Sequence, residues 1–348
     1  MSNADGSALK VLVVDDSAAV RAALAKGLKA QGLNVVGGAS DPYMARDLLF
    51  KLGPDVLTLD LQMPNMDGMT FLAKLMVYRP MPVVVLSSLT SANHELALRA
   101  LELGAVEVFP KPGGGAAIAA MEGLAAALRR AAKAHARPEA LPRPTARLSG
   151  NLDLDRVVAV GASTGGTSAI HSLLASLPPL FPPMLIVQHM PSGFTDPFAR
   201  RLDRLGKLRV KEAEDGDLLT PSQVLIAPGG QHMGLERSQG RLRVRCASGA
   251  PVHHVMPSVD VLFHSVAQHA KDKAVGVLLT GMGRDGAEGL LAMRQAGART
   301  LAQDEASSVI WGMPREAHRL GAAETLVPLE HIGARLSALL EQRAPVTI

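Results

Sequence analysis

The 348-residue sequence contains little cysteine and few aromatic side chains. Its one cysteine, Cys246, excludes an intrachain disulfide and fits a reducing compartment. We expect Cys246 to serve as a small apolar residue and not as a nucleophile. Aromatic residues make up only 3% of the chain, which argues against a platform on which nucleic-acid bases stack.

The sequence also has only a small excess of one charge and no long apolar runs. Lys and Arg number 36 against 32 Asp and Glu, and most of the excess lies in residues 116–150, with six basic and two acidic side chains. We therefore expect no folded part to bind nucleic acid. No apolar run approaches the roughly 18 residues that span a bilayer, and residues 1–10 lack the apolar core of a signal peptide. We expect a cytoplasmic protein that does not insert into a membrane.

Short apolar runs alternate with amphipathic stretches over the first 115 residues. Runs rich in β-branched residues predict strands, and the stretches between them predict helices. The predicted strands are residues 11–14, 34–37, 56–59, 83–86 and 106–109, and the predicted helices are 17–31, 42–52, 68–78 and 93–103. Such alternation is typical of a parallel sheet with helices on both faces.

The next stretch separates this domain from the rest of the chain. An alanine-rich helix is predicted over residues 116–136, and residues 137–150 contain Pro138, Pro142 and Pro144 among basic residues. Few apolar side chains are available for burial there, which is typical of a semi-rigid linker. We place a first domain at residues 8–130, a linker at 131–152 and a second domain at 153–346.

The second domain has a similar alternation with additional short strands. Strands are predicted at residues 157–160, 184–188, 274–280 and 300–303, and helices at 165–177, 195–205, 259–269, 287–295 and 332–342. Residues 224–226 and 241–245 flank a glycine-containing turn, and we expect them to add antiparallel strands. The pattern predicts a mixed, mostly parallel, doubly wound α/β domain.

Polar residues of the first domain gather where its strands end. Asp15 and Asp16 follow the first predicted strand, Asp60 follows the third, Ser87 the fourth and Lys111 the fifth. Ligands bind at the carboxyl ends of strands in an open α/β sheet. Three converging carboxylates repel one another unless a hard cation lies among them, and Mg²⁺ suits such an oxygen-rich site. Carboxylates, Mg²⁺, a hydroxyl and a lysine together suit phosphoryl transfer to an aspartate.

A glycine-rich turn at residues 161–166 of the second domain has two interpretations. It could cradle a pyrophosphate, but the spacing is not G-x-G-x-x-G, and the next strand ends in Gln188 and His189 instead of an acid. Alternatively, it presents Ser163 on a sharp strand-to-helix turn. His189 and Asp285 also follow strands, so a nucleophile, a base and an orienting acid are expected at one edge of the sheet.

The residues around the acidic cluster resemble the receiver domain of two-component response regulators. The matching segments are Val13-Val14-Asp15-Asp16-Ser17, Asp60-Leu61-Gln62-Met63-Pro64 and Phe109-Pro110-Lys111-Pro112. The resemblance implies a flavodoxin-like fold with Asp60 as the phosphoacceptor. It also implies that Asp15, Asp16 and Asp60 bind Mg²⁺, and that Ser87 and Lys111 contact the phosphate.

Several segments of the second domain resemble the chemotaxis protein-glutamate methylesterase family, CheB. They are Gly161-Ala162-Ser163-Thr164-Gly165-Gly166, Gln188-His189-Met190, Ala227-Pro228-Gly229-Gly230-Gln231-His232-Met233, Pro257-Ser258-Val259-Asp260, Thr280-Gly281-Met282-Gly283-Arg284-Asp285-Gly286, Ala302-Gln303-Asp304-Glu305 and Trp311-Gly312-Met313-Pro314. The resemblance implies that Ser163, His189 and Asp285 are catalytic and that the backbone N–H of Met282 stabilises an oxyanion. It implies no metal in this domain.

Together the two resemblances imply a hydrolase that is activated by phosphorylation. Its substrates would be glutamate γ-methyl esters and glutamine amides on chemoreceptors, and a histidine kinase would donate the phosphoryl group. The alternative is a receiver-controlled module that docks on receptors or sequesters a partner without hydrolysis. A nucleotide-dependent enzyme is less favoured because the strand ends in Gln188-His189 instead of an acid. A DNA-binding output is less favoured because the second domain is nearly neutral.

Overall fold

The computed structural model describes residues 8–63, 67–87, 91–111, 117–134 and 152–341. The chain divides into two compact units, Met1–Ala140 and Leu141–Ile348. Each unit is described by itself below. Most of the expected linker, residues 135–151, lies outside the described residues.

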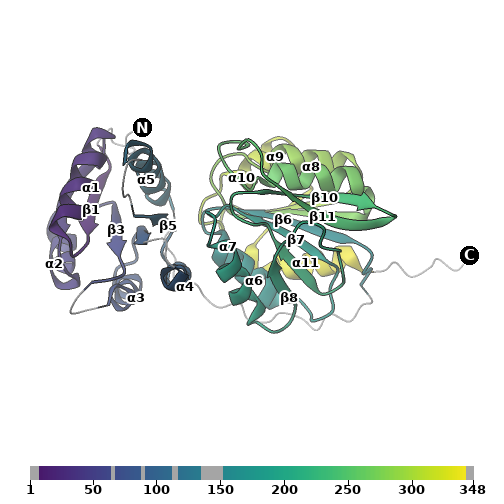
Figure 1. Ribbon diagram of the computed structural model, residues 1–348, viewed down its shortest axis with the longest axis horizontal. Helices are drawn as coiled ribbons and strands as arrows, with labels where there is room; N and C mark the ends of the chain where they lie inside the picture. Colours follow the sequence, from purple (N-terminus) through teal and green to yellow (C-terminus); the bar gives the residue numbers. More distant parts are fainter. Residues whose placement is uncertain (1–7, 64–66, 88–90, 112–116, 135–151, 342–348) are drawn as a thin grey trace, which may run out of the picture. The chain divides into compact units, whose positions relative to one another are not determined.

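The first unit is an open parallel sheet with a helix after each strand (Figure 1). Its elements are β1 (Lys10–Val14), α1 (Ala18–Ala30), β2 (Asn34–Ala39), α2 (Pro42–Leu52), β3 (Val56–Asp60), α3 (Gly68–Tyr78), β4 (Val83–Ser87), α4 (Ser91–Glu102), β5 (Glu107–Pro110) and α5 (Ala117–Ala131). The strand order is β2-β1-β3-β4-β5, and every pairing is parallel. This is the α/β arrangement that the apolar periodicity predicts.

The positions of the strands and helices follow from local sequence. The apolar runs of β3 and β4 are fully buried, because helices cover both faces of the sheet. Side-chain caps fix where helices start after the strands: Ser17 accepts a hydrogen bond from the N–H of Val20, and Asp67 accepts one from the N–H of Met69. The loops between strand ends and capped helices therefore meet at one edge of the sheet.

The second unit is built around a larger parallel sheet. Its elements are β6 (Val157–Ala162), α6 (Gly166–Ser176), β7 (Met184–Gln188), α7 (Thr195–Asp203), β8 (Arg209–Glu212), β9 (Gln223–Ile226), β10 (His232–Ser238), β11 (Arg241–Ala247), α8 (Val259–His269), η2 (Lys271–Lys273), β12 (Ala274–Leu278), α9 (Ala287–Gln295), β13 (Arg299–Gln303), α10 (Met313–Arg319), β14 (Thr325–Val327) and α11 (Leu329–Leu340). The sheet order is β14-β13-β12-β6-β7-β9-β8, and β10 and β11 form a separate antiparallel hairpin.

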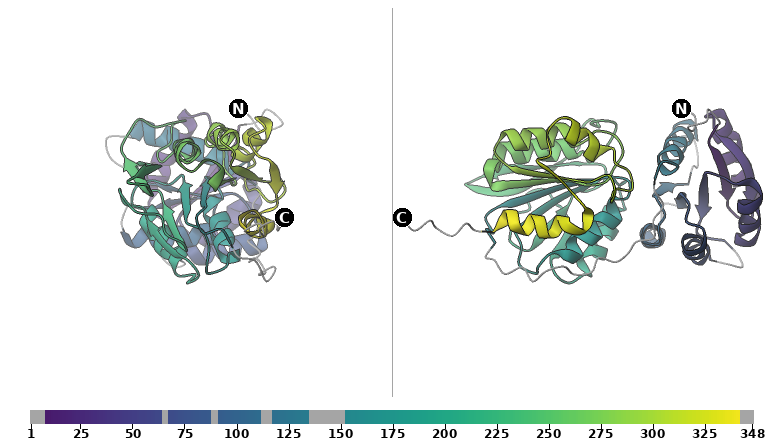
Figure 2. Two further views of the ribbon diagram at one scale, coloured as in Figure 1. Left: turned by 90° about the vertical axis from the view of Figure 1, so that its right-hand side faces the viewer. Right: turned by 180° about the vertical axis from the view of Figure 1, so that it is seen from behind.

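Helices and the hairpin cover both faces of this second sheet (Figure 2). α8, α9 and the hairpin pack on one face, and α6, α7 and α11 lie on the other. The chain leaves β6 towards β7 on one side and later returns to β12 on the other side. Such a reversal of strand order opens a crevice at the carboxyl ends of the central strands, where ligands of α/β proteins bind.

One sequence expectation about this unit is wrong. Residues 224–226 do not add an antiparallel strand: they lie in β9, which pairs parallel with both β7 and β8. The sequence does not predict β8, a strand of four residues. Because β8 and β9 are parallel, the chain between them crosses back to the opposite edge of the sheet before β9 begins. Residues 241–245 do lie in an antiparallel strand, β11. The short elements β10, β14 and α10 were also not predicted.

Among the described residues, no helix is both long and apolar enough to cross a membrane.

Candidate active site

Ser163 lies in the tight turn between β6 and α6. Its N–H donates to the carbonyl of Thr280 at 3.0 Å, and its own carbonyl accepts from the N–H of Gly166 at 2.7 Å. Gly165 has a φ of 77°, and a Cβ there would come within 2.5 Å of the Cβ of Val309. Only glycine fits this left-handed, crowded position, so the turn holds Ser163 at the carboxyl edge of the sheet.

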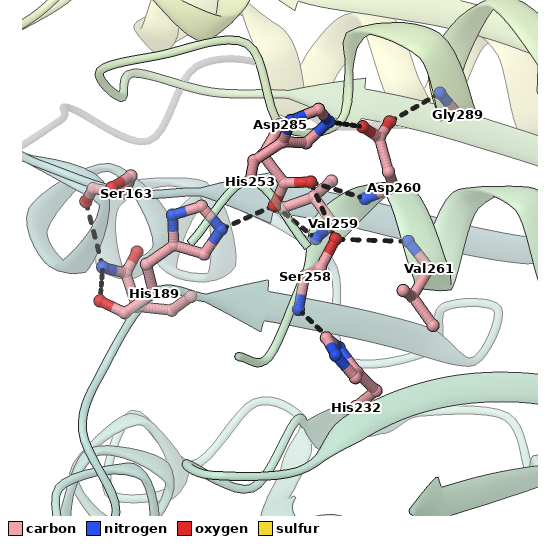
Figure 3. A network of polar contacts seen from close by, with 11 residues as sticks. Ser163, His189, His232, His253, Ser258, Val259, Asp260, Val261, Asp285 and Gly289 are labelled. Carbon is pink, nitrogen blue, oxygen red and sulfur yellow. Dashed lines mark hydrogen bonds and ion pairs between the residues drawn. The ribbon is translucent and has the colours of Figure 1, made fainter. Parts of the chain in front are cut away.

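His189 follows β7, the strand beside β6. Its N–H donates to the carbonyl of Ala162 at 3.1 Å, which fixes its backbone next to the Ser163 turn. Its Nε2 lies 2.8 Å from Oδ2 of Asp285. The proton of the neutral imidazole therefore lies on Nε2, and Nδ1 keeps a free lone pair. Figure 3 shows the ring between Ser163 and Asp285, with Nδ1 on the side of Ser163.

Asp285 lies in the loop between β12 and α9, against the N-terminus of α8, and is only 3% exposed. Its Oδ1 accepts from the hydroxyl of Ser258 at 2.7 Å and from the N–H of Asp260 at 3.1 Å, and its Oδ2 accepts from the N–H of Val259 at 2.7 Å (Figure 3). Burial alone raises the pKa of Asp285, but the contacts with His189, Val259 and Ser258 outweigh it and hold this pKa below its usual value. Asp285 is therefore an ionised carboxylate at neutral pH.

The three side chains have the order of a serine hydrolase triad. Among the described residues, the Ser163 hydroxyl donates no hydrogen bond to His189. Such contacts are often long in a ligand-free site and shorten when the substrate binds. The carboxylate holds the imidazole, and the free lone pair of the imidazole is on the side of the hydroxyl. This arrangement suits general-base activation of a nucleophile.

The backbone of Gly281 lies directly against Ser163. A Cβ at Gly281 would come within 2.8 Å of the Cβ of Ser163. The Gly281 carbonyl accepts from the N–H groups of Gly312 and Met313 at 3.1 and 2.8 Å, which fixes the loop. Within the described parts of the chain, the Met282 N–H has no hydrogen-bond partner. A fixed, unpaired N–H beside the candidate nucleophile Ser163 would suit an oxyanion hole.

Sequence reasoning missed the residues that hold the nucleophile turn. Gln188 Nε2 donates to the Ser163 carbonyl at 2.9 Å, and the hydroxyl of Thr280 donates to the Thr164 carbonyl at 3.0 Å. Both side chains are buried. Both residues lie in segments that resemble the CheB family, but the sequence assigns neither of them a role at the Ser163 turn. The contact of Gln188 with Ser163 depends on the pairing of β6 with β7, which nothing in the local sequence reveals.

Cys246 does not belong to this site. It lies on β11, and burial, with a smaller contribution from Asp215, raises the pKa of its thiol to about 12. A thiol that stays protonated at neutral pH is a poor nucleophile. The structure therefore agrees with the expectation that Cys246 is not a nucleophile.

A second polar cluster lies at the carboxyl edge of the first sheet. Asp15 follows β1 and Asp60 ends β3, and both are almost fully buried. Lys111 Nζ lies 2.6 Å from Oδ2 of Asp60 and 3.1 Å from Oδ2 of Asp15. Burial raises the pKa of Asp60, and the hydrogen bond from Lys111 offsets this shift only in part. A second cation here would stabilise both carboxylates.

The donor atoms of this cluster fit Mg²⁺. One oxygen each of Asp15, Asp16 and Asp60 lies within 4.8 Å of the others, and Asp16 is exposed. The buried Oδ2 of Asp15 is paired with the Lys111 ammonium at 3.1 Å, and an oxygen that already faces a cation can serve as a ligand. Carboxylate oxygens open to water are the ligands that Mg²⁺ prefers. Ser87 ends β4 at the same edge, and its carbonyl accepts from the N–H of Lys111 at 2.8 Å.

Comparisons with known proteins match both units. A family model described as CheB methylesterase matches residues 158–336, and a response regulator receiver domain model matches residues 11–121. A protein from Syntrophotalea carbinolica named protein-glutamate methylesterase/protein-glutamine glutaminase is 49% identical over 96% of this chain and 98% of its own length. A protein of that name from Yersinia pestis is 50% identical over 95% of this chain and 97% of its own.

A solved structure supports the same assignment for the second unit. The CheB methylesterase catalytic domain of Thermotoga maritima is 37% identical, with a TM-score of 0.52, over 53% of this chain and 98% of its own chain. The family model for that domain covers half of this chain, and relatives about 50% identical cover nearly all of it. The chain therefore belongs to the CheB methylesterase family, with a response regulator receiver domain at its N-terminus.

Proposed function

We propose that this protein is a phosphorylation-activated hydrolase that demethylates glutamate γ-methyl esters and deamidates glutamines on chemoreceptors. The observation that carries the proposal is the 2.8 Å contact between His189 and the buried Asp285, beside a serine on a glycine-bounded turn. Relatives named protein-glutamate methylesterase/protein-glutamine glutaminase support this substrate class. We assign the receiver to residues 8–130, the linker to 131–152 and the catalytic domain to 153–346.

In the proposed mechanism, Ser163 is the nucleophile. Its Oγ attacks the ester carbonyl, and His189 Nδ1 takes the hydroxyl proton while Asp285 stabilises the imidazolium that forms. The Met282 N–H donates to the oxyanion of the tetrahedral intermediate. When the carbon–oxygen bond of the ester breaks, His189 returns the proton to the leaving group and methanol departs.

The second half of the reaction regenerates the enzyme. Water gives a proton to His189 and attacks the acyl-enzyme, which releases the glutamate side chain and protonates Ser163 again. With a glutamine substrate, the first step releases ammonia instead of methanol, and the second step is the same. Every group in this scheme is a side chain or a backbone N–H of the chain, so we propose no cofactor for the catalytic domain.

We propose that Asp60 accepts a phosphoryl group from a histidine kinase. Asp15, Asp16 and Asp60 would hold Mg²⁺, which balances the charge of the transferring phosphoryl group. Lys111 and Ser87 would contact the phosphate on Asp60. We propose a cytoplasmic location, which the proposed kinase partner and receptor substrate and the lone cysteine support.

A methanol-release assay tests the proposal against the docking alternative. Purified protein is mixed with methyl-labelled chemoreceptor, with and without a small-molecule phosphodonor and Mg²⁺. We expect release that rises with the phosphodonor, that is lost in Ser163→Ala, and that is kept in Ser168→Ala, a matched change in the first turn of α6. Receptor binding without methanol release in the wild-type protein would favour the docking module.

A further inference from the structure

The N-terminus of helix α8 is capped by a carboxylate that lies next to α9, and the N-terminus of α9 is capped by a carboxylate of α8. Asp285, just before α9, accepts hydrogen bonds from Val259 and Asp260 in the first turn of α8. Asp260 in turn accepts from the N–H of Gly289 in the first turn of α9, at 2.6 Å from its Oδ1. Each acid therefore satisfies free N–H groups of the other helix. Asp285, the proposed triad acid, is one of these two capping carboxylates.

The other capping carboxylate, Asp260, is buried beside Asp285 and is 4% exposed. Burial raises the pKa of Asp260, and the nearby negative charge of Asp285 raises it further, against the hydrogen bonds from Gly289 and His253. Two carboxylates this close are stable only while each keeps its donors.

His253 supplies one of these donors from outside the helices. Its Nε2 lies 3.0 Å from Oδ2 of Asp260, and its Nδ1 lies 3.4 Å from Nε of Arg284 (Figure 3 shows the first contact). Because Arg284 donates a hydrogen bond to Nδ1, the imidazole proton lies on Nε2, and the Nε2–H donates a hydrogen bond to Asp260. A second carboxylate–imidazole pair therefore lies behind Asp285, on the side opposite to His189.

The backbone at His253 has an uncommon conformation. His253 and His254 have φ values of 52° and 65°, in the left-handed region that non-glycine residues rarely adopt. Such conformations persist where the surrounding structure holds them in place. The strained turn presents the His253 ring to Asp260, whereas His254 is exposed and makes no hydrogen bond to another described residue.

This group of acids and histidine is not assigned to a metal. Donor atoms of His253, Asp260 and Asp285 lie within 4.8 Å of one another. Each carboxylate oxygen of the two acids already accepts a hydrogen bond from the protein. A cation would have to displace these donors, so a structural role fits better than a metal site.

We propose that His253 and Asp260 are positioning residues that hold Asp285 in the orientation in which its Oδ2 meets His189. The inference rests on the proposed triad. The N-termini of α8 and α9 are in direct contact: a Cβ at Gly286, the residue after Asp285, would come within 2.6 Å of Val259 Cγ1. A shift of Asp260 would therefore move the turn that carries Asp285, and small displacements of catalytic groups are costly in rate.

The test measures how fast a fluorophosphonate probe labels Ser163 in the full-length protein, across a range of pH. His253→Asn removes the imidazole, and asparagine tolerates the left-handed backbone. His254→Asn is the matched control, with the same substitution at a neighbouring left-handed residue. We expect labelling at least about tenfold slower in His253→Asn and unchanged in His254→Asn, within the roughly hundredfold that a misplaced group can cost.

Asp260→Asn separates positioning from mere stability. The amide oxygen can still accept from Gly289, but the negative charge beside Asp285 is gone. The other titratable or charged groups in contact with this network are His189, His253, Arg284 and His232. We expect slower maximal labelling and a midpoint of the pH dependence displaced to lower pH. A lower melting temperature with an unchanged rate and midpoint would show that Asp260 is only structural.

The outcomes distinguish this inference from the proposed function. Wild-type protein that is not labelled at Ser163 would contradict the triad itself. If wild-type protein is labelled and both His253→Asn and Asp260→Asn match it in rate and midpoint, the triad stands and the positioning role is overturned.

Discussion

His189 Nε2 and Asp285 Oδ2 lie 2.8 Å apart, although 96 positions separate the two residues in the sequence. The order of parallel strands brings them together, since β6 lies between β7 and β12 and the three strands end at one edge. The sheet thus fixes the position of His189 relative to Asp285. Ser163 lies in the turn after β6, the strand between them.

The first test concerns the cooperation of Ser163 and His189. If both act in one proton transfer, removing the second after the first should cost little. We expect Ser163→Ala and His189→Ala each to abolish most methanol release. The rate of the double variant should be no more than about tenfold below that of the less active single variant. Steady-state kinetics with circular dichroism as a folding control measures this. Multiplicative losses would contradict a shared role.

The second test concerns the charge of Asp285. Its pKa in the folded protein lies below the ordinary value, so its ionised form stabilises the fold. This stabilisation is present above the pKa of the unfolded chain and is lost as the pH falls through the lower pKa of the folded state. We expect Asp285→Asn to melt at a lower temperature than wild type at neutral pH, with a difference that narrows from about pH 5 to about pH 3.

Thermal unfolding at several pH values measures this difference. His189→Gln is a useful companion, because it removes the imidazole but leaves the donors from α8 in place. A gap between wild type and Asp285→Asn that stays constant down to low pH would mean that the charge of Asp285 does not contribute.

The third test concerns Lys111 and Mg²⁺. Lys111→Met would leave Asp15 and Asp60 without their cation, and removing one partner of a fully buried ion pair costs about 3–5 kcal/mol. Lys111 is 28% exposed, so we expect a loss nearer the lower figure. Bound Mg²⁺ would replace the missing charge, since a ligand stabilises the state that binds it. Mg²⁺ should therefore raise the melting temperature of Lys111→Met more than that of wild type.

Differential scanning calorimetry with MgCl₂, and with CaCl₂ to test selectivity, measures this response. Lys51→Met is the matched control, because Lys51 is exposed and forms no ion pair with another described residue. Equal Mg²⁺ responses in all three proteins would argue against a cation site among Asp15, Asp16 and Asp60.

Much of this architecture could be predicted because its signals are local. Buried strands such as β3 and β4 are continuous apolar runs, and polar residues directly after them lie at the ligand-binding edge of a parallel sheet. These local signals place Asp60 and Ser163 at strand ends from the sequence alone. Recognition of the family motifs then supplied roles that spacing alone left open.

The remaining features depend on contacts between distant residues. The parallel pairing of β9 follows from β8, whose four residues carry too short a pattern to recognise. The capping of each helix by Asp260 or Asp285 depends on how α8 packs against α9. No periodicity in one helix reveals the acid that caps it from another. The sequence therefore indicates the proposed catalytic groups, but it does not reveal what the residues that hold them do.

The last test concerns the control of hydrolysis by the receiver. Strands β1–β5 form one sheet, and the strands of the second unit form sheets of their own. Each unit also buries its own apolar side chains. We therefore expect the catalytic domain to fold after removal of residues 1–150, as circular dichroism and a cooperative melt would report.

If phosphorylation activates the enzyme by relieving inhibition, the receiver must lower activity while Asp60 is unmodified. A free-energy change of about 1.4 kcal/mol on phosphorylation shifts the ratio of inhibited to active protein tenfold. Removal of residues 1–150 should then raise basal methanol release and abolish its response to phosphodonor, whereas Asp60→Asn in the full chain should stay at the basal rate. If the shortened protein is folded but slower than the unphosphorylated full chain, the receiver is not an inhibitor. It would then contribute to catalysis directly, by completing the site or by recruiting the receptor.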